Sequence, residues 1–572
     1  MTYPIIATAD FETDPFEHGV IVEPFAWGFY DGTSYTSYWG DPKRQWSDAA
    51  PAFLNHIHSL KEPHIIYFHN GGKFDFFIGK LVEHFDDNVQ IINARIVKAF
   101  IGIQQFRDSY TILPFPLSEF SIHKNQDFSK FTRSNRERNK QSISIYMKQD
   151  VLDLHLLVSE YRNQFGDVLT IGQSAIRKLA EFHPFERGRA GFDTVFRKFY
   201  FGGRCQAFKT GIIKGSYKLY DVNNMYGTAM ANTAHPVGIE RSLSNKITDN
   251  TDFACIEAIN YGALPSRDLT GGLDFTKENG TFYATIHEII AGLETNRLKI
   301  LRIKHAYSFK HKSNFATFVN QYADMRAKHK ANFAKDGDLL EKARALFIKY
   351  LVNSSYGKLA QDPRGYFDWL MRHEAIGFPN SLCEYASYTN GKRLCPECEQ
   401  EKRPECRRQW QIGETAYDWI LWRRESAHAN YYNVAAGASI TGAARAILLQ
   451  GIAVAEEPLY CDTDSIIARS LDVEVDEFKL GAWKEETEAD KVVIAGKKLY
   501  AMFLAEKCVK KASKGVSTSA EEIERVAANS NTTVEYTNPA PRFKLDGTVL
   551  FVSRKIRQTG KKSIKIINSI PC

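Results

Sequence analysis

The chain has 572 residues, a length that predicts roughly four domains. Of these residues 44% are hydrophobic and 25% are charged, which is typical of a folded protein rather than of a disordered one. No apolar run approaches the ~18 residues that a membrane helix needs, and the first residues lack the basic and apolar segments of a signal peptide, so we expect a cytoplasmic protein with no membrane partner. Nine cysteines, an odd number, do not indicate a disulfide framework in such a chain.

The net charge of +7 is concentrated near the C-terminus. Residues 501–572 hold 13 Lys and Arg against 6 Asp and Glu, an excess that equals the charge of the whole chain. A basic segment of this kind predicts a polyanionic partner, most simply nucleic acid, and the alternative is a solvated basic face.

The first predicted strand, residues 5–9, ends in two acids. Asp10 and Glu12 are two positions apart, and the alternation of a strand places both on one face. A second apolar run, residues 65–68, leads into a turn with two glycines that ends at Asp75.

A helix is predicted to begin at Ser142. It carries Tyr146 and Asp150, which are four residues apart and therefore neighbours on one helix face. Each of these acidic fragments alone also fits solvated surface acids. Together they place four carboxylates on buried elements, as expected for two metal ions ~4 Å apart that hydrolyse a phosphodiester. In such a site Tyr146 would orient the attacking water, and the carboxylates would be those of Asp10, Glu12, Asp75 and Asp150.

Three further acids follow in the second half of the chain. Asp221 ends a strand predicted over residues 217–222, whereas Asp462 and Asp464 lie between apolar stretches. That pattern predicts a β-hairpin with the two acids at its tip. Because carboxylates at a tight turn repel one another, a hard divalent cation would relieve the cost, which indicates phosphoryl transfer.

Residues 315–358 are predicted to form two helices, interrupted at residues 336–338. On the second helix Lys349, Asn353 and Tyr356 share a face, and Arg326 shares a face of the first helix with a further lysine. Basic side chains from two helices could neutralise a triphosphate. The alternative is an amphipathic helix with solvated lysines.

In order and spacing these motifs resemble those of family B DNA polymerases with a proofreading exonuclease. The three N-terminal patches resemble the three exonuclease motifs of that family, and residues 221–226, 349–357 and 460–465 resemble its three polymerase motifs. Residues 200–203, 441–445 and 498–500, with two long insertions, resemble the protein-primed polymerases of small phages and linear plasmids.

The resemblance implies a multidomain α/β and α+β fold, with an RNase H-like exonuclease domain and a right-hand polymerase of palm, fingers and thumb that carries two insertions. The expected boundaries are 1–165 for the exonuclease domain, 166–226 for the linker and palm start, 227–314 for the first insertion (a terminal-protein region), 315–360 for the fingers, 361–430 for the second insertion, 431–500 for the palm and 501–572 for the thumb.

The resemblance also implies a role for individual residues. Synthesis would be catalysed by Asp221 and Asp462, with Asp464 as a weaker ligand, and metal would also bind the Val222 carbonyl. The incoming nucleotide would meet Val222, Tyr226, Arg326, Lys349, Asn353 and Tyr356, with Tyr226 as the steric gate that rejects ribonucleotides. DNA would contact Thr13, His69, Asn70, Phe74, Ser109, Tyr110, Gly202, Gly203, Thr441, Arg445, Lys498 and Tyr500.

We therefore expect a DNA-dependent DNA polymerase with 3′–5′ exonuclease activity that starts from a terminal protein. Its partners would be template and primer DNA, dNTPs and the terminal protein, its ions Mg²⁺ or Mn²⁺, and its state a monomer. The alternatives are a family B enzyme primed by nucleic acid, a stand-alone exonuclease with a basic tail, and a non-catalytic DNA-binding relative.

Four cysteines, Cys383, Cys395, Cys398 and Cys406, lie close together in the second insertion. Four thiolates could bind one tetrahedral zinc ion, although only one close pair is present where zinc sites usually have two. Free thiols are the alternative.

Overall fold

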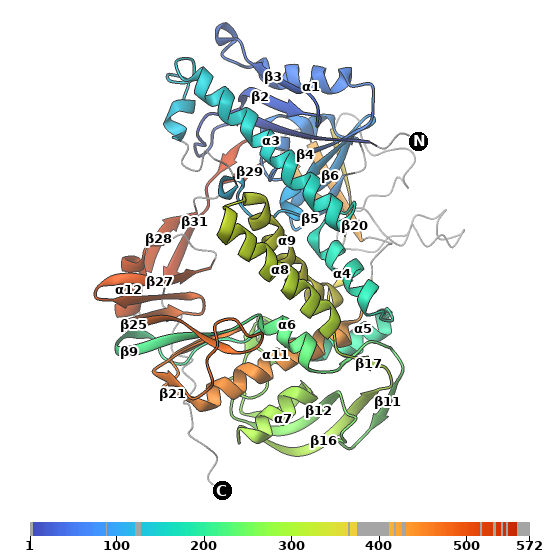
Figure 1. Cartoon of the computed structure of the whole chain (residues 1–572), viewed down its shortest axis with the longest axis vertical. Helices are drawn as coiled ribbons and strands as arrows, with labels where there is room; N and C mark the ends of the chain where they lie inside the picture. Colours follow the sequence, from blue (N-terminus) through green and yellow to red (C-terminus); the bar gives the residue numbers. More distant parts are fainter. Residues whose placement is uncertain are drawn as a thin grey trace.

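The computed structural model describes residues 4–86, 89–120, 127–363, 367–373, 411–416, 419–425, 431–514, 518–529, 533–538, 541–544 and 547–557. In Figure 1 the N-terminal domain lies at the top, a helical hairpin at the centre, and a second large sheet with its insertion below.

The N-terminal domain is built on a seven-stranded sheet of order β3-β2-β1-β4-β7-β6-β5. β1 pairs in parallel with β4, and β4 with β7, whereas the other neighbours are antiparallel. Its strands are β1 (Ile5–Thr13), β2 (Pro24–Tyr30), β3 (Tyr35–Trp39), β4 (His64–Phe68), β5 (Gln90–Ile92), β6 (Arg95–Ile101) and β7 (Gln104–Asp108), and short α2 spans Asp75–Ile78.

Alternate residues of β1 serve the two faces of this sheet, as the sequence predicts. Ala7, Ala9 and Phe11 join the core that α1 (Ala49–Ser59) covers, where Phe11 meets Phe53 at 4.9 Å between ring centroids. The intervening residues face α3 (Lys140–Phe165), and the hydroxyl of Thr8 donates to the carbonyl of Val151 at 2.7 Å. This contact holds α3 beside the acidic end of β1.

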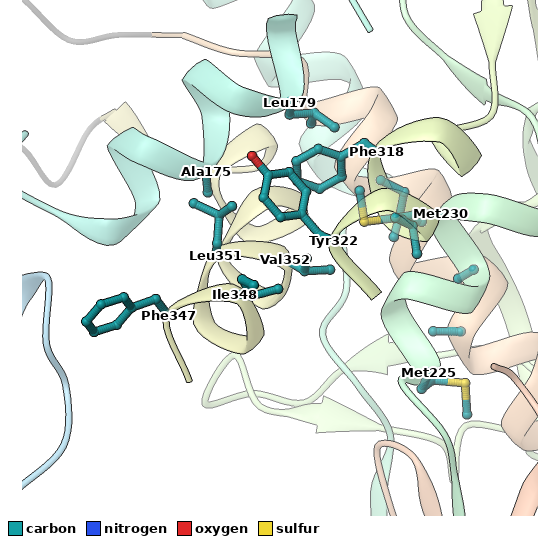
Figure 2. Packing of buried hydrophobic residues seen from close by; sticks show 14 of the residues in the cluster. Ala175, Leu179, Met225, Met230, Phe318, Tyr322, Phe347, Ile348, Leu351 and Val352 are labelled. Carbon is teal, nitrogen blue, oxygen red and sulfur yellow. The ribbon is translucent and has the colours of Figure 1, made fainter. Parts of the chain in front are cut away.

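The central helical hairpin consists of α8 (Ala316–Asp336) and α9 (Leu339–Leu359), which confirms the two predicted helices. Gly337 ends α8 in the left-handed conformation (φ 69°), and the Asp338 side chain caps α9. Figure 2 shows buried side chains of α8 and α9 gathered with those of α4 (Ile171–Phe182) and α6 (Met225–Asn232). Through this cluster the helical hairpin packs against α4 and α6.

The second large sheet has the order β27-β26-β25-β9-β23-β22-β8, and every neighbouring pair is antiparallel. β9 begins earlier than predicted, at Gly211, but ends at Val222 as expected. α11 (Val434–Val454) packs against this sheet. The strands are β8 (Cys205–Ala207), β9 (Gly211–Val222), β22 (Tyr460–Asp462), β23 (Ser465–Ala468), β25 (Trp483–Gly496), β26 (Leu499–Leu504) and β27 (Lys507–Ser513), with the small pair β21 (Ala455–Glu456) and β24 (Ser470–Leu471) beside them.

The first insertion folds around a four-stranded antiparallel sheet of order β11-β16-β12-β15. α6 crosses its predicted start and packs on α8 and α11, so the insertion's own fold begins after Asn232. Its elements are β10 (His235–Pro236), β11 (Arg241–Ser244), β12 (Phe253–Asn260), β13 (Ser266–Arg267), β14 (Leu273–Asp274), β15 (Asn279–Thr285), α7 (Ile286–Glu294), β16 (Leu298–Phe309) and β17 (Lys312–Ser313).

In the second insertion the described part is a three-stranded antiparallel sheet. It contains β18 (Phe367–His373), β19 (Gln411–Ala416) and β20 (Trp419–Glu425), and Trp369 bridges to Val89 of the N-terminal domain. The four cysteines Cys383, Cys395, Cys398 and Cys406 lie outside the described residues.

The C-terminal region lies at the left in Figure 1 and returns to the N-terminal domain. Thr548 bridges to Ile21, and the Val549 amide donates to the Val20 carbonyl at 2.9 Å. Its elements are α12 (Ala520–Ala528), β28 (Thr533–Thr537), β29 (Arg542–Phe543), β30 (Val549–Leu550) and β31 (Ser553–Arg557), and α5 (Ala190–Phe196) belongs to the linker between the two halves.

One described helix, α11, is long and apolar enough to cross a membrane by length and composition alone, contrary to the expectation from apolar runs. Its most apolar window is 78% buried inside the protein, where it contacts α6, α7 and α9. Its apolar composition is therefore explained by burial on most of its sides.

We predict that Gly451→Ala destabilises the protein by about 1–3 kcal/mol through overpacking. The new methyl group would lie 2.4 Å from Cζ2 of Trp483, at the contact of α11 with β25. Gly357→Ala is the matched control in α9, where nothing lies within 4 Å of the new carbon and about 0.5–1 kcal/mol should be gained. Thermal unfolding measures both, and a midpoint for Gly451→Ala at or above that of the control would contradict this packing.

Candidate functional site

The three acids of the second half come together on adjacent strands of the large sheet. Asp221 is the cross-strand partner of Ser465, and Ser465 is also the partner of Asp462 across the hairpin. The Val222 amide donates to the Asp464 carbonyl at 2.8 Å. Thr463 takes a left-handed conformation (φ 59°) between the two acids, so the predicted hairpin with acids at its tip is confirmed.

Two of these carboxylates, those of Asp464 and Asp221, resist ionisation. Burial, then the charges of Asp221 and Asp462, raises the pKa of Asp464 to about 7. Burial also raises the pKa of Asp221, against the lowering effect of Lys484, whose Nζ lies 3.2 Å from Asp221 Oδ1. On the other side, Nζ of Lys498 donates to both carboxylate oxygens of Asp462 at 2.6 Å. Two lysines therefore offset part of the repulsion within this acid set.

An aromatic stack lies beside the hairpin. The rings of Tyr226 and Tyr356 are 4.0 Å apart at an interplanar angle of 16°, and Tyr356 comes from α9. A methyl group on Gly203 would lie 2.7 Å from Oγ1 of Thr463 and 2.9 Å from the Tyr226 hydroxyl. Gly203 therefore fits closely between the acidic turn and the tyrosine, where only glycine leaves enough room.

The basic residues predicted on the helical hairpin differ in their surroundings. Lys349 and Asn353 are exposed on α9. Arg326 on α8 is half-buried, burial lowers its pKa, and its Nε is buried without a hydrogen-bond partner among the described residues. A buried donor without an acceptor is suited to an anionic ligand.

The four N-terminal acids also form one group. Asp10 and Glu12 lie on the α3 face of β1, Asp75 begins α2, and Asp150 lies on α3. Burial and the charges of Asp75, Glu12 and Asp150 raise the pKa of Asp10 well above its ordinary range. Burial raises the pKa of Asp75 to about 7 and that of Asp150 to about 6. Tyr146 bonds to Asp150, and burial raises the tyrosine's own pKa.

Both acid sets fit divalent cations. Oε1 of Glu12 is buried without a hydrogen-bond partner among the described residues, and the neighbouring carboxylates raise the pKa of Glu12 in addition to burial. Carboxylate oxygens are the ligands that Mg²⁺ prefers. In the part of the chain that is described, no group of three or more His, Cys, Asp or Glu is arranged as a metal site. A divalent cation would have to draw these carboxylates together as it binds.

The residues predicted to hold single-stranded DNA surround the N-terminal acid set. Asn70 has a left-handed conformation (φ 66°), Phe74 packs on Phe16 and Phe543, and Thr13 and Tyr110 are half-buried. His69 and Ser109 are internal. The His69 ring contacts the Ser109 hydroxyl at 3.0 Å and the Phe115 carbonyl at 2.9 Å, and burial lowers its pKa to about 4.

Several of the other residues predicted to contact DNA are buried. Thr441, Arg445 and Tyr500 are 1%, 3% and 5% exposed. Thr441 bonds within α11, Arg445 donates to the Gly202 carbonyl at 2.9 Å, and Tyr500 packs on Tyr460. These three side chains therefore contact other parts of the protein rather than solvent. Gly202, in contrast, is exposed.

The sequence predictions missed further residues at these sites. Lys484 is placed opposite Asp221 by the β9–β25 register, which the sequence does not reveal. Asp108 is 1% exposed, pairs with Arg95 and accepts from the amides of Gly72 and Tyr110. Asp108 directly precedes Ser109 and Tyr110 in the sequence, but only the fold shows that its carboxylate anchors the glycine turn before Asp75.

The chain is similar to known DNA polymerases over most of its length. A family model described as DNA polymerase type B, organellar and viral, matches residues 118–445. The chain is 41% identical over 585 aligned positions to the DNA-directed DNA polymerase of Enterobacteria phage PRD1, and the alignment covers 97% of this chain and 98% of that one.

Solved structures of Phi29 DNA polymerase share the fold. Its ternary complex with primer-template DNA and incoming nucleotide substrates matches with a TM-score of 0.69 at 16% identity, over 97% of this chain and 100% of that one. Its binary complex with primer-template DNA has a TM-score of 0.68 with the same coverage. The predicted multidomain α/β fold is confirmed, since the fold of Phi29 DNA polymerase matches over 97% of the chain.

We predict that metal-free protein loses stability as the pH rises from about 4 to about 7. The folded pKa of Asp75 is about 7, above that of an unfolded aspartate, so in this window the folded state holds a proton that the unfolded state has released. Asp75→Asn should flatten the dependence of the unfolding midpoint on pH, measured in chelator, and the exposed control Asp472→Asn should not. An unchanged slope in Asp75→Asn would show that this carboxyl titrates normally.

Proposed function

The chain belongs to the organellar and viral type B DNA polymerases and is a DNA-directed DNA polymerase, and we propose that it extends a protein primer and proofreads with a separate 3′–5′ exonuclease site. One observation carries the proposal. Two sets of mutually repelling carboxylates lie in different sheets, one around Asp221, Asp462 and Asp464, and one around Asp10 and Asp75.

In the proposed polymerase site, Asp221 and Asp462 hold Mg²⁺, or Mn²⁺ in its place, with the Val222 carbonyl as a further ligand and Asp464 as a weaker one. Polymerases of this family generally use divalent metals. When bound, such ions would neutralise the phosphates and polarise the reacting hydroxyl. Lys484 and Lys498 keep the carboxylates in position by partly cancelling their repulsion.

The nucleotide would enter between the hairpin and the fingers. Tyr226 would lie under the sugar and exclude a 2′-hydroxyl, and its stack on Tyr356 fixes the ring in that place. Arg326, Lys349 and Asn353 would meet the triphosphate and the new base pair from α8 and α9. The unpaired Nε of Arg326 supports this role.

In the proposed exonuclease site, Asp10, Glu12, Asp75 and Asp150 hold the second set of ions. Tyr146, bonded to Asp150, would orient the attacking water. The raised pKa values of these acids mean that cations are needed for full ionisation near neutral pH. Thr13, Asn70, Phe74 and Tyr110 are half-buried, so part of each remains free to hold a frayed strand, and the His69 ring contacts Ser109.

The placement of the two insertions supports a protein primer. The first insertion is a folded sheet that lies beside the palm, as expected of a region that receives a terminal protein (Figure 1). In this proposal the enzyme acts as a monomer in the cytoplasm of the host cell, on template DNA, primer strand and dNTPs.

We predict that Asp462→Ala reduces primer extension to background and leaves degradation of single-stranded DNA intact, because the two acid sets are separate. Asp10→Ala should do the reverse. Asp472→Ala is the control, because it removes an exposed acid ten positions after Asp462, and it should keep both activities. Loss of both activities in either single variant would contradict two separate sites.

We predict that labelled dATP, Mg²⁺ and a candidate terminal protein give a labelled protein without any oligonucleotide. Asp462→Ala should abolish this label, and a terminal protein without its priming hydroxyl should not accept it. Label that appears only on DNA, and only when an oligonucleotide is added, would favour the nucleic-acid-primed alternative.

A further inference from the structure

The segment of residues 201–205, which we call the linker segment, runs along the acidic turn of the polymerase site. The Arg204 carbonyl accepts from the Thr463 amide at 2.6 Å, and Cys205 is the cross-strand partner of Asp462. Gly203 touches Thr463 and Tyr226. The position of this segment therefore fixes the position of the turn that carries Asp462 and Asp464.

Two buried arginines hold the linker segment, and both are held in turn by the first insertion. Arg445 donates through Nη1 to the Phe201 and Gly202 carbonyls and through Nε to Oε1 of Glu288 at 2.8 Å. Glu288 is 1% exposed and begins α7 of the insertion. Its other oxygen accepts from the amide and the hydroxyl of Thr285 at 3.1 and 2.8 Å, so the carboxylate is fixed in one orientation.

Arg204 makes the second connection. It is 2% exposed, its Nη1 donates to the Gly262 carbonyl of the insertion at 2.8 Å, and its guanidinium lies 4.3 Å from the ring centroid of Phe275. Burial lowers the pKa of Arg204 to about 10. Oε1 of Gln206 accepts from Nε and Nη2 of the guanidinium at 3.0 and 2.7 Å. The side chain is anchored in the insertion, while the main chain of the same residue bonds to the catalytic turn.

The contact between α11 and α7 leaves little freedom for movement. A methyl group on Gly442 of α11 would lie 2.2 Å from Oγ1 of Thr285, so the two helices approach as closely as a glycine allows. Three contacts thus join the insertion to the palm: the buried ion pair of Arg445 with Glu288, the hydrogen bond from Arg204 to the Gly262 carbonyl, and the close approach of Gly442 to Thr285.

We propose that Glu288 and Arg204 are positioning residues of the polymerase site, through which the first insertion sets the position of the turn that carries Asp462 and Asp464. A change in the insertion, including the binding of a partner there, is then transmitted to the catalytic carboxylates through the linker segment. This inference rests on the proposed assignment of that turn to DNA synthesis.

Glu288→Gln tests it, because the change removes the charge and keeps the size. We expect kcat for primer extension to fall on the order of 10- to 100-fold, as for a displacement of about 1 Å at the reacting groups. The KM for primer-template DNA and the degradation of single-stranded DNA should stay within about twofold. Glu288→Asp, which keeps the charge, should restore part of kcat. Arg204→Met, which removes the hydrogen bond to the Gly262 carbonyl, should lower kcat in the same way as Glu288→Gln.

A second readout does not depend on catalysis. Hydrogen exchange of the peptide that contains residues 460–465 should become faster in Glu288→Gln. Arg445 then holds the linker segment less firmly, so the Arg204 carbonyl that accepts from the Thr463 amide is less fixed. Asp252→Asn is the control: it alters another buried carboxylate of the insertion, bonded to Lys312 and to the Phe309 amide but not to the linker segment. It should leave this exchange and the kcat of the folded protein unchanged.

Two outcomes would overturn the inference. One is unchanged exchange at residues 460–465 in folded Glu288→Gln with kcat within about twofold. The other is an equal loss of synthesis and degradation in Glu288→Gln and Asp252→Asn, which would indicate general destabilisation. The assignment of Asp462 to DNA synthesis has its own test, because Asp462→Ala would retain synthesis if that assignment were wrong. Failure of the present inference and failure of the assignment can therefore be told apart.

Discussion

Repulsion among buried carboxylates is the constraint around which this molecule is built. A carboxylate taken out of water loses solvation, and a second one nearby makes its ionisation harder still. In both acid sets the backbone prevents the side chains from moving apart. In the N-terminal domain β1, α2 and α3 each supply acids, and the bond from Thr8 to the Val151 carbonyl holds α3 in place. In the palm the register of β9, β22 and β23 has the same effect.

The two sets differ in how the repulsion is balanced. In the palm, Lys484 and Lys498 bind Asp221 and Asp462, while burial raises the pKa of Asp464 to about 7 and also raises that of Asp221. In the N-terminal domain burial and the charges of Asp150 and Asp75 raise the pKa of Glu12, and a backbone hydrogen bond from Phe11 offsets only part of the rise at Asp10. The N-terminal set therefore has less internal compensation for its repulsion, whereas the palm set is partly balanced by lysines of the same sheet.

Local patterns were sufficient to predict the elements that carry the acids. Alternation along residues 5–13 placed Asp10 and Glu12 on one face, and apolar stretches around Asp462 and Asp464 indicated the hairpin, both as observed. Partners across distant strands could not be found in this way. The β9–β25 register brings Lys484 to Asp221 over more than 260 positions, and no local signal encodes that pairing.

The capping box at Thr285 and Glu288 is an instructive intermediate case. The pattern of a threonine followed three residues later by glutamate is a local signal for a helix start, and α7 does begin there. The same glutamate also pairs with Arg445, 157 positions away, which only the packing of α11 on α7 reveals. A residue with an adequate local explanation can therefore still have a second, non-local role.

The buried arginines also determine how the insertion relates to the palm. Arg204 and Arg445 belong to the palm side of the chain, yet Glu288 and the Gly262 carbonyl, which balance them, belong to the insertion. Without the insertion, each guanidinium would keep its acceptors on the palm side and lose the one that the insertion supplies. For Arg445, which is 3% exposed, that loss is a broken buried ion pair, which typically costs about 3–5 kcal/mol. The insertion is therefore part of the support of the turn that carries Asp462 and Asp464, because the buried charge of Arg445 is paired with a carboxylate that belongs to the insertion.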